Sequence, residues 1–143
     1  MSNEGQTTIL PTEDHWRCEY DIPTKPLSTL ISAGEMAKVR LIKIDVEGAE
    51  WFVVSGMRTL LTHARQDLEV VVEISPKRLQ SMHRHPEDIL EIFSQVGFIP
   101  YHLKNDYSIA GYLHQDNLKP IRIREPIPSQ VDVIFSRKNA DWL

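Results

Sequence analysis

Three carboxylates follow two apolar runs of the sequence. In RLIKIDVEGAEWF, Asp45 and Glu47 come directly after a β-branched stretch and precede Gly48, and in LEVVVEIS, Glu73 and Ser75 end a second such stretch. Carboxylates at these positions can accept hydrogen bonds from hydroxyl groups, take up a proton as a general base, or bind a divalent cation. Alternatively, they only stabilise the N-terminus of a following helix, which favours acidic side chains.

The elements that must hold these side chains follow from the apolar periodicity. β-branched runs predict buried strands, and apolar residues at helical spacing predict helices. The resulting order is strand 39–46, helix 48–64, strand 68–75, helix 86–98, strand 98–104 and strand 131–138. Alternating strands and helices indicate an α/β fold with parallel strands and flanking helices, whereas the last two strands, without a helix between them, should pair antiparallel.

This order of elements places the carboxylates where an α/β sheet binds its ligands. In an open α/β sheet, ligands bind outside the carboxyl ends of the strands, where Asp45, Glu47 and Glu73 are expected. In an extended strand, Asp45 and Glu47 would point to the same side. Gly48 would allow a tight turn, Glu50 is expected to be a surface acid of the first helical turn, and Gly56 should bend or end the first part of that helix.

Other candidate groups are weaker. MHRHP places His83 and His85 close together, but a surface loop is a more common reading of such a pair than a metal site. KPIRIRE brings Lys119, Arg122 and Arg124 together, either to meet an anionic substrate or as a solvated face. The sequence contains neither a G-x-G-x-x-G or P-loop pattern nor a G-x-S-x-G elbow.

Composition limits the classes of protein that fit. The 143 residues suffice for one domain with a real core, and the net charge of -4 argues against a protein held to nucleic acid or anionic lipid by its overall charge. Cys18 is the single cysteine, which excludes an intrachain disulfide and favours a reducing compartment. The N-terminus has no signal pattern and no run is long enough to span a membrane, so we expect a cytoplasmic protein.

The segment LIKIDVEGAEWFVVSGMRTLL resembles the core motif of the FkbM-type methyltransferases, which are class I enzymes that use S-adenosylmethionine. PLSTLI precedes it, and VVVEIS, EDILEIFSQVGFIPYHL and VDVIFSRK follow it, in the order of the family. The resemblance covers residues 26–138. It implies a Rossmann-like sheet whose fourth and fifth strands are LIKIDVEG and LEVVVEIS, closed by a C-terminal antiparallel strand pair.

The resemblance also implies a function. FkbM-type enzymes mostly methylate hydroxyl groups of sugars, polyketides and related metabolites, so we expect S-adenosylmethionine as the cofactor and a small hydroxyl acceptor as the partner. It suggests Asp45 and Glu47 as catalytic residues, Asp45 and Gly48 as cofactor-binding residues, and Glu73 and Ser75 as substrate-binding residues. It suggests no metal ligand.

Class I methyltransferases hold the cofactor with the first strand and a glycine-rich turn, and no such turn precedes Val39. We therefore expect residues 39–138 to be the C-terminal half of the domain. An irregular segment with a short helix, residues 1–38, would precede this half, and a tail, residues 139–143, would follow it. The fourth strand would then be an exposed edge, which a second copy or a partner chain could cover.

Two other functions fit the same residues. A non-catalytic interaction module, or a truncated remnant, would retain the sheet of the family but lack cofactor binding. A metal-dependent hydrolase would use Asp45, Glu47 and a histidine. The intact KIDVEGAE motif favours a methyltransferase, or the acceptor-side half of one, as the interpretation to test.

Overall fold

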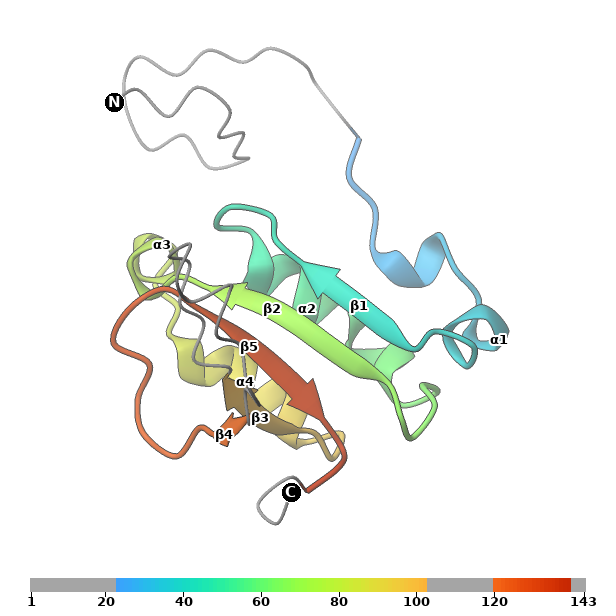
Figure 1. Cartoon of the computed structure of the whole chain (residues 1–143). Helices are drawn as coiled ribbons and strands as arrows, with labels where there is room; N and C mark the ends of the chain where they lie inside the picture. Colours follow the sequence, from blue (N-terminus) through green and yellow to red (C-terminus); the bar gives the residue numbers. More distant parts are fainter. Residues whose placement is uncertain (1–22, 103–119, 140–143) are drawn as a thin grey trace, which may run out of the picture.

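A five-stranded sheet organises the part of the chain that the computed structural model describes, residues 23–102 and 120–139 (Figure 1). Its strands are β1 (Leu41–Ile44), β2 (Glu69–Ile74), β3 (Ile99–His102), β4 (Ile121–Arg122) and β5 (Val131–Ser136). The helical elements are a short 3-10 turn η1 (Leu27–Thr29) and the helices α1 (Ala33–Met36), α2 (Glu50–Leu61), α3 (Pro76–Ser81) and α4 (Pro86–Ser94). The fold is thus mixed α/β, as predicted.

The strand order in the sheet is β1-β2-β5-β3-β4. β1 and β2 are parallel, with Ile44 opposite Val72, and β5 lies antiparallel between β2 and β3, with Val133 opposite both Val72 and His102. The antiparallel pairing of the last two predicted strands is therefore confirmed. β3 runs in the same direction as β1 and β2, but β5 separates it from them, so the parallel arrangement is only partly present.

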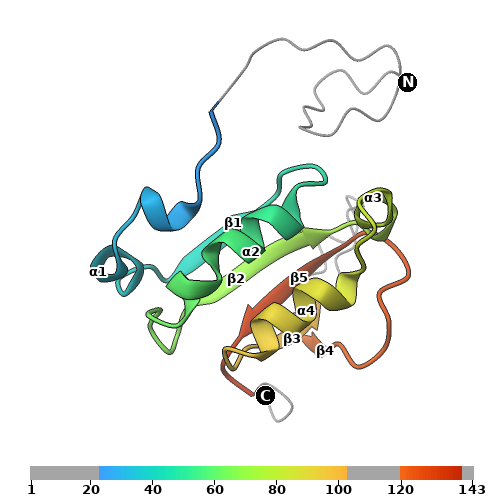
Figure 2. The ribbon, with the colours of Figure 1, turned by 180° about the vertical axis from the view of Figure 1, so that it is seen from behind.

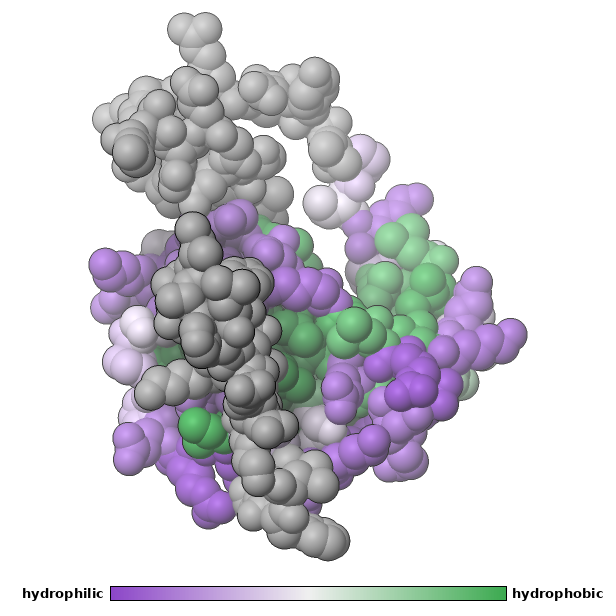
Figure 3. Space-filling model, in the orientation of Figure 1, coloured by the Kyte–Doolittle hydropathy of each residue, from purple (hydrophilic) through white to green (hydrophobic). Residues whose placement is uncertain are grey.

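The core lies between one face of the sheet and the helices α2 and α4, which Figure 2 shows in front of the sheet. Along β2, the side chains of Val70, Val72 and Ile74 are fully buried in this core, while the residues between them face the other side. The ring of Phe93 from α4 stacks on Phe135 from β5, with 3.8 Å between the ring centroids. The opposite face, seen in Figure 3, has a hydrophobic area bordered by hydrophilic residues.

The helices differ from the sequence prediction in three ways. α2 continues through Gly56 without a break, because Val54, Met57 and Leu61 are buried on one stripe and hold the helix against the sheet. The short helix expected before Val39 is instead the separate elements η1 and α1. The short helix α3, which begins at Pro76, was not predicted; proline stops β2 but suits the first turn of a helix.

Arg137 joins the ends of α2 and α4 to the end of β5. Its guanidinium donates hydrogen bonds to backbone carbonyl oxygens at and just after the C-terminal ends of both helices, and it lies 4.1 Å from the centre of the Phe98 ring. The four acceptors are the carbonyls of Leu61 at 2.9 Å, Arg65 at 3.0 Å, Val96 at 3.2 Å and Ala64 at 3.4 Å. A cation thus satisfies carbonyl groups that have no partner within the helices.

Several expectations concern residues at the limits of the described part. Five features lie outside the described residues: Cys18, Lys119, most of the predicted N-terminal segment, the last two residues of the predicted strand 98–104, and all but Asn139 of the predicted tail. Among the described residues, β1 is an edge strand of the sheet, and Leu41 on it is 62% exposed. The pairing of β1 with another chain stays a prediction. Within residues 23–102 and 120–139, the helices are too short and too polar to cross a bilayer.

Candidate active site

The three acids singled out in the sequence meet at one end of the sheet. β1 and β2 both end there, and the antiparallel β5 begins there. One carboxylate oxygen from each of Asp45, Glu47 and Glu73 lies within 4.8 Å of the other two. These three residues, hereafter the acid cluster, are half exposed at Asp45 and more buried at the other two positions. The structure therefore places them together, at the carboxyl ends of the parallel strands.

The turn between β1 and α2 brings Glu47 into the cluster. β1 ends at Ile44, and Glu47 and Gly48 both have positive φ angles, of 50° and 110°. Strand alternation is therefore not the reason that Asp45 and Glu47 lie together, because the chain is no longer extended at Glu47. The tight turn expected at Gly48 is confirmed, and a left-handed glutamate beside it is a strained arrangement that recurs at functional sites.

Glu50 holds this turn in place. Its side chain is only 1% exposed, and its Oε1 accepts a hydrogen bond of 2.9 Å from the backbone N–H of Gly48. The prediction of a surface acid at Glu50 is therefore wrong: the residue is buried beneath the turn that it stabilises. The sequence signal was the spacing of two residues from Gly48, which allows a side chain to reach back to a turn N–H.

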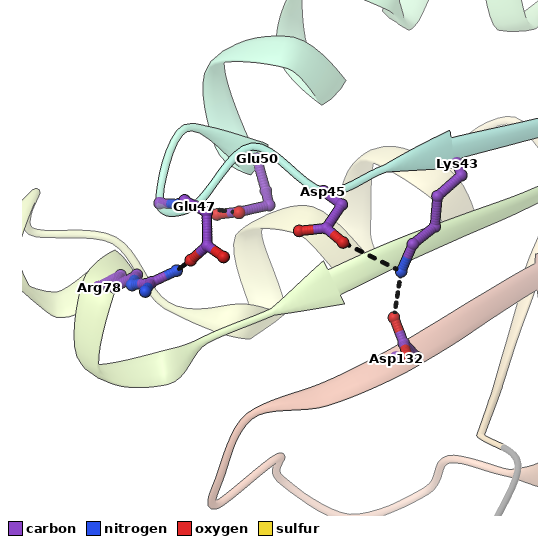
Figure 4. Close-up of polar contacts among 7 residues, drawn as sticks. Lys43, Asp45, Glu47, Glu50, Arg78 and Asp132 are labelled. Atoms are coloured by element: carbon purple, nitrogen blue, oxygen red, sulfur yellow. Dashed lines mark hydrogen bonds and ion pairs between the residues drawn. The ribbon is translucent and has the colours of Figure 1, made fainter. Parts of the chain in front are cut away.

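Two basic residues neutralise part of the acid cluster (Figure 4). Arg78, from α3, forms an ion pair with Glu47. Nζ of Lys43, from β1, lies 3.7 Å from Asp45 and forms an ion pair with Asp132 of β5. The pKa of Lys43 is raised, because its burial, which acts to lower the pKa, is outweighed by the bond to Asp132 and the attraction of nearby acids.

Sequence reasoning missed these partners. Lys43 could have been found, because it precedes Asp45 by two residues in a strand and so shares its side of the sheet. Arg78 lies on the unpredicted helix α3, and Asp132 reaches Lys43 because β5 pairs with β2 in a register that the sequence does not reveal.

Glu73 has the most unusual environment of the cluster. Burial raises its pKa; interaction with the Gln130 side chain acts in the opposite direction, and Asp45, Glu47 and Asp132 raise it further. Its Oε2 is buried and has no hydrogen-bond partner among the described residues. A carboxyl group in this position retains a proton more readily than an ordinary glutamate and is, when ionised, a stronger base.

Two other candidate groups lie outside the acid cluster. Ser75 is 6% exposed and occupies the N-cap of α3 without a side-chain capping hydrogen bond, so its role in substrate binding stays a prediction. Among the histidine, cysteine and acidic residues of the described ranges, the acid cluster is the group whose ligand atoms lie close enough to share an ion, and it includes neither His83 nor His85.

The arrangement suits proton transfer and the binding of hydroxyl or cationic groups. Four carboxyl groups face two basic side chains here: Asp45, Glu47, Glu73 and Asp132 against Lys43 and Arg78. The excess of acids attracts positive charge, and the half-exposed Asp45 can accept hydrogen bonds from a ligand. A sulfonium cofactor and a hydroxyl acceptor both fit this donor set, and a hard divalent cation would find oxygen ligands.

Comparison with known proteins identifies the family. The family model of the FkbM methyltransferase domain matches residues 2–100, more than half of the chain and including β1, the acid cluster, β2 and α4. No curated protein and no solved structure matches the chain. The motif that places Asp45, Glu47 and Gly48 in the turn after β1 thus lies within the match. The chain belongs to the FkbM methyltransferase domain family.

Proposed function

We propose that the protein transfers a methyl group from S-adenosylmethionine to a hydroxyl oxygen of a small metabolite such as a sugar or a polyketide. The observation that supports this most is the acid cluster at the carboxyl ends of β1 and β2, in a chain of the FkbM family. Ligands of open α/β sheets bind at this end.

The turn after β1 is the proposed cofactor contact. Gly48 has no side chain and adopts a φ of 110°, so its backbone leaves room for a ligand that lies close to the turn. The half-exposed carboxylate of Asp45 would accept hydrogen bonds from the cofactor or compensate its positive charge. S-adenosylmethionine supplies an electrophilic methyl group on a sulfonium centre, which a positioned oxygen nucleophile can attack.

The remaining acids are proposed to handle the acceptor. Glu73 would accept a hydrogen bond from the reacting hydroxyl, and its raised pKa makes it a suitable proton acceptor. Glu47, fixed by its ion pair with Arg78, would orient the hydroxyl together with Asp45. The ammonium of Lys43 lies between Asp45 and Asp132. Lys43 would therefore limit the repulsion among the neighbouring carboxylates when Glu73 ionises.

The test measures methyl transfer from radiolabelled S-adenosylmethionine to a panel of hydroxylated sugars and polyketides. Asp45→Asn should lower turnover by a factor of about 100 or more, the range that general acid–base and positioning groups contribute. Glu69→Gln is the matched control, because Glu69 lies at the other end of β2 and outside the acid cluster. Thermal melting of each variant verifies that the fold is retained.

Calorimetric titration with S-adenosylhomocysteine separates loss of the cofactor from loss of turnover. Full turnover by a folded Asp45→Asn variant would exclude the proposed role of Asp45. A folded wild-type chain that binds no S-adenosylhomocysteine and transfers no methyl group would instead favour the non-catalytic module.

A further inference from the structure

Glu50 is a buried acid to which the proposed methyl transfer assigns no part. Its side chain is 1% exposed, and one carboxylate oxygen, Oε2, is buried without a hydrogen-bond partner in the part of the chain that the structure describes. A buried carboxylate is costly to the fold unless its oxygens are paired, so stability alone does not account for an acid at this position. The hydrogen bond that its other oxygen accepts therefore indicates what Glu50 contributes.

That hydrogen bond holds a turn of unusual conformation. Oε1 of Glu50 accepts a hydrogen bond of 2.9 Å from the backbone N–H of Gly48. The backbone bond that closes the turn, from the N–H of Ala49 to the carbonyl oxygen of Val46, is longer, at 3.4 Å. The two central residues, Glu47 and Gly48, have φ angles of 50° and 110°, and a type I′ turn has positive φ at both positions. Asparagine, aspartate or glycine usually fills the first of them, so a glutamate there stays left-handed only because its surroundings hold it.

The conformation of the turn decides where the Glu47 side chain lies. With its φ angle at 50°, Glu47 directs its carboxylate into the acid cluster and forms the ion pair with Arg78 that Figure 4 shows. A change of φ to the negative values that glutamate prefers would turn this side chain away from the rest of the acid cluster. Glu50 thus fixes the backbone of the turn, while Arg78 binds the carboxylate that the turn presents.

We propose that Glu50 is a positioning residue, which orients Glu47 within the acid cluster by accepting the N–H of Gly48. The proposal rests on the methyl transfer proposed above as the reaction that the acid cluster serves. A misplacement of about 1 Å at a reacting group lowers turnover by about 100-fold. The reach of the Glu50 side chain should therefore decide turnover, and its charge should not, because a neutral oxygen accepts the same hydrogen bond.

Three substitutions separate reach from charge. Glu50→Gln retains the length of the side chain and an acceptor oxygen, so turnover of the best acceptor of the panel should stay within about threefold of the wild type. Glu50→Asp retains the charge but is one methylene shorter, and Glu50→Ala removes the acceptor. Both should lower kcat by about 100-fold at saturating S-adenosylmethionine.

Glu35→Ala is the matched control, because it removes a hydrogen bond of the same kind elsewhere. The Glu35 carboxylate accepts the backbone N–H of Ser32 at 2.8 Å at the start of α1, which precedes β1 and lies outside the acid cluster. This variant should leave kcat unchanged. Urea unfolding of each variant gives the folded fraction, so that kcat is compared per folded molecule.

Hydrogen exchange of the Gly48 amide follows the positioning without any acceptor. In the nitrogen-15-labelled chain, this amide should be protected in the wild type and in Glu50→Gln. It should exchange about tenfold faster in Glu50→Asp and Glu50→Ala, the factor that corresponds to the loss of one buried hydrogen bond. Should both shorter variants unfold, protection of this amide in the wild type and in Glu50→Gln decides whether the hydrogen bond exists.

Retained turnover in Glu50→Gln together with lost turnover in Glu50→Asp and Glu50→Ala is the expected result. A folded Glu50→Gln variant as inactive as Glu50→Ala, or a folded Glu50→Asp variant as active as the wild type, would overturn the proposal. A Gly48 amide that exchanges alike in all four proteins would overturn it as well. A wild type that neither binds S-adenosylhomocysteine nor transfers a methyl group would refute the proposed function instead, and the amide exchange would still decide whether Glu50 holds the turn.

Discussion

Replacement of Arg137 by methionine tests how the fold holds its two main helices against the sheet. The guanidinium binds four carbonyl oxygens at and beyond the C-terminal ends of α2 and α4, three of them at 3.2 Å or less, and it stacks over Phe98. Methionine retains much of the apolar stem and removes the charge and all five donors. The variant therefore isolates the polar contribution of this side chain.

The expected loss of stability can be worked from these contacts. Three good hydrogen bonds at about 1 kcal/mol each and a cation–π contact of about 0.5–1 kcal/mol give about 3–4 kcal/mol. The burial that lowers the pKa of Arg137 opposes this sum, because it penalises the charged form in the native state. We expect the free energy of unfolding to fall by about 3 kcal/mol, and the melting temperature by about 6–12 °C.

Urea unfolding followed by circular dichroism measures this loss, with Arg58→Met as the control. Arg58 of α2 also reaches α4, but it is exposed and its side-chain hydrogen bond among the described residues goes to Gln95. Its loss should therefore change the free energy of unfolding by about 0.5 kcal/mol or less. Equal destabilisation by the two variants would refute the claim that the carbonyl contacts of Arg137 hold the helix ends.

Further predictions concern the acid cluster and two glycines, Gly48 and Gly56. Glu73→Gln should raise the free energy of unfolding at neutral pH. The folded-state pKa of Glu73 lies above its ordinary value of 4.5, so the wild-type protein loses stability as the pH rises through that folded-state pKa. Below about pH 4.5 the carboxyl is protonated in both states, and the wild type and the variant should melt alike. A stability difference that persists unchanged into acid would contradict this. Gly48→Ala should destabilise the fold by about 1–2 kcal/mol, because the φ angle of Gly48 is 110°. Gly56→Ala, inside α2 with no atom within 4 Å of the added Cβ, should stabilise the fold by about 0.5–1 kcal/mol. Urea unfolding measures both changes, and opposite signs would contradict the backbone conformations of the two glycines.

The strands and the two long helices were predictable because their burial follows local periodicity. The alternating pattern of β2 and the apolar stripe of α4 depend on neighbours in the sequence, so the sequence alone indicates them. The position of β5 between β2 and β3 depends on pairing over long distances in the chain, which a local pattern does not specify. β4, with two residues, is too short for any periodicity to appear.

The candidate site was predictable in its members but not in their environment. The end of a β-branched run before a glycine placed Asp45 and Glu47 at the carboxyl end of a strand, and the end of the next such run placed Glu73 there. The burial of Glu50 beneath the turn escaped prediction, because a surface acid of the first turn and a buried cap of the preceding loop have the same sequence position. The basic partners come from α3 and from strand register, which appear only in the folded chain.

The most direct test of the account locates the cofactor on the protein. Titration of the nitrogen-15-labelled chain with S-adenosylhomocysteine should give saturable shifts of the amide signals of residues 45–50 and 73–75, and Asp45→Asn should weaken that binding. Saturable shifts confined to other parts of the chain, or a folded chain whose signals do not change at saturating ligand, would contradict the claim that the acid cluster is the site of methyl transfer.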